Sequence, residues 1–155
     1  MSIDCIIVYG RAVDHRPCHY TWNAIRELLR LRWAFVYISK SHGQSSKDFW
    51  TNMGQPSHTF PLLKLYTKRE GHYILQHSFS CSEFLNYVRG LGNALPTVDD
   101  TSCFYQEERY TAGYAIANDR QAVYRLASDS QSFIYRPEQH ELELRQREID
   151  RNFRV

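Results

Sequence analysis

The residues best suited to chemistry in this chain of 155 residues form one short run, Arg16-Pro17-Cys18-His19-Tyr20-Thr21. A helix is predicted to begin at Cys18, because apolar side chains recur after it at helical spacing: Trp22, Ile25, Leu28 and Leu29. A thiol at a helix N-terminus faces unpaired backbone N–H groups and the positive end of the helix dipole, and both stabilise the thiolate. Arg16 would add a positive charge. The pattern therefore makes Cys18 a candidate nucleophile for thiol–disulfide exchange.

The other cysteines lie far apart in the sequence. The chain has four, Cys5, Cys18, Cys81 and Cys103, and none forms a zinc-type pair with a neighbour. In a reducing compartment we expect free or redox-active thiols rather than structural disulfides. Cys5 lies in an apolar run, so we interpret it as a buried hydrophobic residue. His15, Cys18 and His19 are too crowded to close a metal site unaided, and we predict no metal.

The elements that must position Cys18 follow from the spacing of apolar residues over the first 92 positions. Strands are predicted at 5–9, 34–38, 61–66 and 73–76, with helices starting at Cys18, over 47–53 and over 82–88. The last helix is expected to have Ser82 as its cap. Two parallel strands need a helical crossover between them. The order therefore predicts an α/β domain with a mixed sheet and helices on both of its faces.

Residues 93–155 differ in composition and are interpreted as a C-terminal extension. Runs at 113–117 and 121–126 flank Asn118 and Asp119, as in a hairpin, although a helix over 121–127 fits almost as well. A further short strand is predicted at 133–135. From Pro137 to about Phe153 the charged composition predicts a solvated helix.

Several motifs appear in the order found in one family. The basic residue and cysteine at Arg16 and Cys18 are followed by Gly54, by Thr59-Phe60-Pro61 and by Cys81-Ser82-Glu83. Over about three fifths of its length the chain resembles a glutaredoxin. The resemblance implies a thioredoxin-like fold with a mixed four-stranded sheet and flanking helices, and a cis peptide bond before Pro61.

The resemblance also implies a site for glutathione. Cys18 would be catalytic, and the residues that match binding positions of the family are Arg16, Tyr20, Thr59, Phe60, Pro61, Cys81 and Ser82. The backbone of Phe60 would pair with the tripeptide, and the N–H groups at Cys81 and Ser82 would receive its γ-glutamyl carboxylate.

Three departures from the family pattern narrow this expectation. Thr21 occupies the position of the second cysteine of dithiol members, which implies a monothiol route resolved by glutathione or by Cys81. Phe79-Ser80 replaces a pair of glycines that let glutathione approach closely. His19-Tyr20-Thr21 replaces the Gly-Phe-Ser of members that share an iron–sulfur cluster, so no cluster is expected.

Two functions therefore stay open. One is glutathione-linked exchange on protein disulfides. The other is an inactive thioredoxin-fold interaction module whose partner is set by the extension; a cellular and a viral origin both stay open, and a viral module would act on a host protein. A net charge of +2 gives no global reason to expect nucleic acid as partner, and no window has the roughly 18 apolar residues of a membrane span. We expect a cytoplasmic protein.

Overall fold

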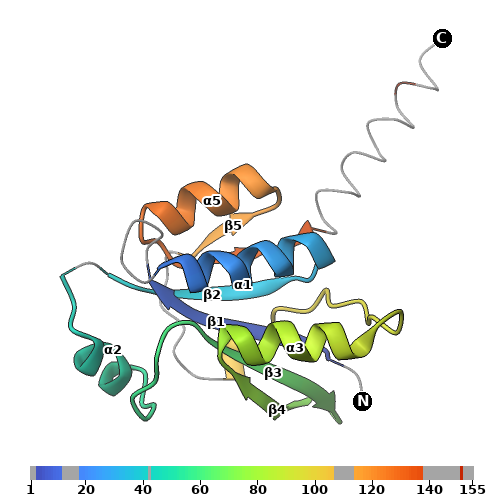
Figure 1. The fold of residues 1–155 in the computed structure, drawn as a ribbon, viewed down its shortest axis with the longest axis horizontal. Helices are drawn as coiled ribbons and strands as arrows, with labels where there is room; N and C mark the ends of the chain where they lie inside the picture. The colour runs from blue at the N-terminus through green and yellow to red at the C-terminus, as the bar shows by residue number, and fades with distance from the viewer. Residues whose placement is uncertain (1–2, 12–17, 42, 107–113, 138–150, 152–155) are drawn as a thin grey trace.

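The computed structural model describes residues 3–11, 18–41, 43–106, 114–137 and 151 (Figure 1). The strands in these ranges are β1 (Cys5–Arg11), β2 (Phe35–Lys40), β3 (Leu62–Arg69), β4 (His72–Phe79), β5 (Ala115–Ala117) and β6 (Phe133–Tyr135). The helices are α1 (Cys18–Leu31), α2 (Ser46–Asn52), α3 (Cys81–Leu91), α4 (Cys103–Gln106) and α5 (Arg120–Ser128).

The described strands form one six-stranded mixed sheet in the order β4-β3-β1-β2-β6-β5. β1 and β2 are parallel, and β3 and β4 add antiparallel strands on the other side of β1, as the sequence predicts. The extension lengthens this sheet: β6 pairs antiparallel with β2, and β5 pairs parallel with β6. The expected four-stranded sheet is therefore the first part of a larger one.

Helices cover both faces of the sheet (Figure 1), and each face has its own apolar core. On one face α1, α3 and α5 bury the side chains of Ile25, Leu28, Phe84, Val88, Val123 and Leu126. On the other face α2 and α4 bury Phe49, Trp50, Cys103 and Phe104 against β1 and β3. Amphipathic helices on both faces explain why the central strands are apolar on both sides.

The extension departs from the hairpin prediction. Residues 121–126 lie in α5 and not in a strand, because the Asp119 side chain accepts a hydrogen bond from the Ala122 backbone N–H at 2.8 Å and caps the helix. The alternative of a helix is thus the right one, and the strand at 133–135 is confirmed. The helix expected from Pro137 to Phe153 lies almost entirely outside the described residues.

The start of α3 also corrects a prediction. Ser80, and not Ser82, is the N-cap: its hydroxyl accepts from the Glu83 N–H at 3.3 Å, while the Glu83 carboxylate accepts from the Ser80 N–H at 3.0 Å. This reciprocal capping box fixes Cys81 as the first residue of the helix.

Two of the cysteines expected to be free are joined. Cys5 and Cys103 form a disulfide across a sequence separation of 98 residues, with their Cα atoms 6.1 Å apart. α4 brings Cys103 under the first strand, a long-range contact with no local sequence signal. Cys81 is a free, buried thiol.

In the described part of the chain, no helix has the length and apolar character needed to cross a membrane.

Candidate functional site

A groove of about 500 Å³ opens at the end of β1, between the start of α1, the segment before β3 and the start of α3. Its walls are formed by Arg11, Tyr20, His58, Thr59, Phe60, Pro61, Ser80, Cys81 and Ser82. Four separate parts of the sequence therefore meet at one site.

The groove brings together most of the residues named from the sequence. Of the eight, six line it: Tyr20, Thr59, Phe60, Pro61, Cys81 and Ser82. The peptide bond before Pro61 is cis, as expected. Cys18 is the first residue of α1, two positions before Tyr20, and its side chain lies outside the described set. Arg16 also lies outside the described residues.

Close packing of α1 on β1 places the helix start beside the groove. A Cβ atom on Gly10 would lie 2.5 Å from the Tyr37 hydroxyl oxygen and 2.9 Å from Cγ2 of Thr21. Only glycine fits at this position, because real Cβ atoms do not approach other atoms so closely. Thr21 itself is buried, and its hydroxyl has no hydrogen-bond partner within the described ranges. The residue three positions after Cys18 is thus a packed, methyl-bearing side chain without a thiol.

Sequence reasoning missed Arg11, the basic residue that the described groove contains. Its guanidinium carbon lies 4.8 Å from the centre of the Phe60 ring, and its Nη2 donates to the Ser46 hydroxyl at 2.9 Å. Both contacts hold the side chain across the groove wall. The sequence shows only that Arg11 directly follows the Tyr9-Gly10 end of the first predicted strand, which does not identify a role in a groove.

A second cation stands next to Arg11. Lys40 pairs with Arg11 in the register of β1 and β2, and it is buried. Burial and, to a smaller extent, the charge of Arg11 lower the pKa of the Lys40 ammonium. Two neighbouring cations at this end of the sheet favour an anionic ligand or a thiolate nearby.

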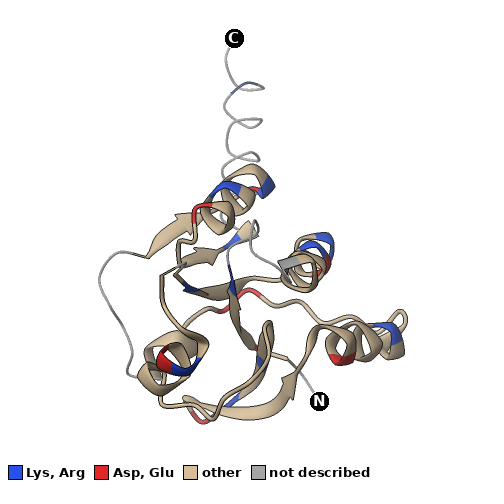
Figure 2. Ribbon diagram, turned by 60° about the vertical axis from the view of Figure 1, so that its left-hand side comes forward, with Lys and Arg blue, Asp and Glu red and all other residues tan. Residues whose placement is uncertain are grey.

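Away from this corner, α1, α2 and α3 each carry both basic and acidic residues (Figure 2) and present no stripe of one sign.

Aromatic rings support the segment before β3. The Trp50 and Phe60 rings are stacked, with centres 5.0 Å apart and an interplanar angle of 21°. His58 packs edge-on against Trp50 at 5.5 Å. His58 and Phe60 both line the groove, so α2 fixes this wall through Trp50.

Cys81 is an unsuitable nucleophile in this structure. Its side chain is only 4% exposed, and burial raises the pKa of its thiol, an effect opposed in part by the backbone N–H of Ala24. A thiol whose pKa is raised is protonated at neutral pH and reacts slowly. Cys81 therefore contributes shape to the groove.

The start of α3 offers backbone donors to the same groove. The capping box uses the N–H groups of Ser80 and Glu83 and leaves those of Cys81 and Ser82, which have no carbonyl partner within the helix. Such donors at a helix N-terminus suit a carboxylate.

Comparison of the chain with protein-family models, with curated proteins and with solved structures finds no match. Within the described ranges, no group of three or more His, Cys, Asp or Glu side chains is placed to hold a metal ion. The site must therefore be interpreted from its own geometry and chemistry.

Proposed function

We propose that the protein is a glutaredoxin-like thiol–disulfide oxidoreductase that uses glutathione by a monothiol route through Cys18. The observation that carries the proposal is the convergence of the six sequence-named residues on one groove beside the start of α1. These residues come from three separate stretches of the sequence, which the fold brings together at the groove.

The charges and donors around the groove support an anionic tripeptide ligand. Arg11 in the groove wall, with Lys40 beside it on β2, provides positive charge, and the N–H groups of Cys81 and Ser82 provide donors in another wall. Glutathione carries a carboxylate at each of its ends, so one would face the cation of Arg11 and the other the N–H groups at the start of α3. The start of α1 would at the same time stabilise the Cys18 thiolate.

The proposed reaction has two exchange steps. The Cys18 thiolate attacks the glutathione sulfur of a mixed disulfide, the S–S bond breaks, and the substrate thiolate leaves and takes up a proton. A second glutathione, as thiolate, then attacks the glutathione sulfur bound to Cys18, which releases oxidised glutathione and restores the Cys18 thiolate. Because Thr21 carries no thiol, no intramolecular Cys-x-x-Cys disulfide competes with the second step.

A specific observation favours the interaction module as second candidate. Ser80 lines the groove with a side chain where the resembled family has glycine, and its backbone has φ −73° and ψ 172°, a conformation open to any residue. The wall is therefore narrower than a glycine pair would make it. An inactive module would keep the groove for a protein segment and need no reactive Cys18.

The test is the reactivity of Cys18. We expect pH-dependent alkylation, with the adduct located by mass spectrometry, to give a thiol pKa below the ~8.5 of a free cysteine. Oxidised glutathione should form a mixed disulfide at Cys18, and Cys18→Ser should abolish turnover of a glutathione mixed disulfide.

The matched control is Cys81→Ser, which removes the other free thiol of the described chain. Glutathione adduct formation at Cys18 should persist in this variant. A Cys18 that alkylates like a free thiol and takes up no glutathione would refute the enzyme and leave the module as the function to pursue.

A further inference from the structure

The disulfide belongs to a different part of the molecule from the groove. Cys5 is the first residue of β1, whereas Arg11, the last residue of the same strand, lines the groove. Six residues of extended chain separate them by about 20 Å at ~3.3 Å per residue. The Cys5–Cys103 pair is therefore out of reach of an exchange reaction at the start of α1 in the same molecule.

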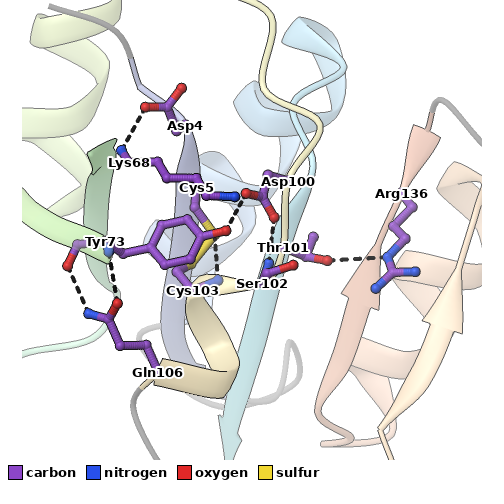
Figure 3. Close-up of a disulfide and its surroundings, with 10 residues drawn as sticks. All are labelled: Asp4, Cys5, Lys68, Tyr73, Asp100, Thr101, Ser102, Cys103, Gln106 and Arg136. Carbon is purple, nitrogen blue, oxygen red and sulfur yellow. Dashed lines mark hydrogen bonds between the residues drawn. A yellow bond between two sulfur atoms is a disulfide. The ribbon is translucent and has the colours of Figure 1, made fainter. Parts of the chain in front are cut away.

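The segment 100–106 is fastened to β1, to β4 and to the residue that follows β6 (Figure 3). Besides the disulfide to β1, the side chain of Gln106 forms two hydrogen bonds of 2.7 Å with the backbone N–H and C=O of Tyr73 in β4. The Tyr73 hydroxyl donates to the Asp100 carboxylate. The Arg136 Nε, just after β6, donates to the Thr101 hydroxyl at 3.2 Å.

Among these interactions the disulfide is the one whose formation depends on redox conditions. Both cysteines are buried, Cys5 with 0% and Cys103 with 1% of its surface exposed. A thiolate cannot reach the sulfurs until segment 100–106 moves away from β1. Once the bond is broken, non-covalent interactions hold the segment, among them these hydrogen bonds and the apolar contacts of Phe104.

We propose that the Cys5–Cys103 disulfide is a redox-dependent lock that fastens the start of the extension beneath the first strand. Oxidised glutathione closes the lock: the two cysteine thiols lose two electrons and two protons, the S–S bond forms, and two molecules of glutathione are released. A dithiol such as dithiothreitol opens it: the two cysteines regain two electrons and two protons from the dithiol, which becomes a cyclic disulfide. Closing the lock removes conformational freedom from the unfolded chain over a loop of 98 residues.

The experiment compares the full chain in its two redox states. The chain is equilibrated at set ratios of reduced to oxidised glutathione, quenched in acid and alkylated, and the Cys5–Cys103 peptide is measured by mass spectrometry. We expect the fraction of disulfide-bonded chain to rise in a single transition as the proportion of oxidised glutathione increases. Opening it with dithiothreitol should lower the melting temperature by about 10 °C or more and raise the rate of proteolytic cleavage within residues 93–106.

Two variants separate the lock from other effects. Cys103→Ala should melt at the same temperature with and without dithiothreitol, whereas Cys81→Ala, which also removes a buried thiol, should keep the full difference. If Cys103→Ala does not fold, the wild-type comparison still decides the question. Recovery of both cysteines alkylated under oxidising conditions, or a reduced chain with unchanged melting and cleavage, would overturn the proposal.

Discussion

At the scale of single residues, long-range contacts decide what a side chain does. Cys5 has the sequence context of a buried hydrophobic residue and is buried, yet its bonding partner lies 98 residues away. Arg11 follows an apolar strand with no sign of a ligand-binding role, yet it lies over Phe60 in the groove. Neighbouring residues in the sequence predict burial well, but they carry little information on such partners.

The Tyr73–Asp100 hydrogen bond gives a testable pH dependence. Burial and, next, the hydrogen bond to Asp100 raise the pKa of Tyr73 to about 12. An unfolded tyrosine ionises near pH 10, so the bond contributes its full stability below about pH 10 and loses it as the pH approaches 12. Urea unfolding of wild type and Tyr73→Phe should show a difference in stability that shrinks between pH 9.5 and 11.5.

The comparison with Tyr73→Phe is needed because other tyrosines titrate in the same range. Burial also raises the pKa of Tyr114 and Tyr135, and their effect is common to both proteins. A difference between wild type and variant that stays constant over this range would contradict the role assigned to the Tyr73 hydroxyl.

At the scale of elements, the first 92 residues were largely predictable. Buried β-branched runs and helical spacing indicated the four strands and three helices in the right order, because both periods are local properties. The extension was harder: residues 121–126 fit either a strand or a helix, and the cap at Asp119 decided for the helix. The errors thus fell where two local patterns competed.

The cap of α3 can be tested by substitution. Ser80→Ala removes the acceptor for the Glu83 N–H and should lower the free energy of unfolding by about 1 kcal/mol. The matched control is Ser82→Ala, which removes only the 3.3 Å contact between the Ser82 and Ser80 hydroxyls, leaves both bonds of the capping box in place, and should change stability by less than about 0.5 kcal/mol. Denaturant unfolding of both variants measures the difference. Equal losses would show that Ser80 does not cap the helix.

At the scale of the whole molecule, the extension is a structural part of the sheet. β6 covers the edge of β2, and Phe133 stacks on Tyr37 with ring centres 5.0 Å apart. Phe35 also contacts Phe133 and Tyr135. Without these strands, β2 would expose an unpaired edge and a row of aromatic side chains.

A chain that ends after Asn93 should therefore be unstable and prone to aggregate. Gel filtration and near-ultraviolet circular dichroism should show association and loss of fixed aromatic packing, in contrast to the full chain. A monomeric, cooperatively folding fragment would show that the first 93 residues form a self-sufficient unit, and would reassign the extension to binding alone.

The difference between local patterns and long-range contacts also explains which residues of the site could be predicted. Six groove residues were predicted because they belong to short motifs, and a short motif can be recognised from neighbouring residues alone. Arg11 and His58 were missed because their presence in the groove depends on how strand ends and helix starts meet in space, whereas Ser80 was named only as part of the pair that replaces two glycines.

The contact between Trp50 and the groove wall has a practical consequence. Indole emission responds to the packing of its neighbours, and Trp50 touches both Phe60 and His58. Trp33 belongs to the core on the opposite face of the sheet and Trp22 packs against that core, and neither lines the groove. The groove therefore carries an intrinsic optical reporter, and its occupancy can be titrated without any attached label.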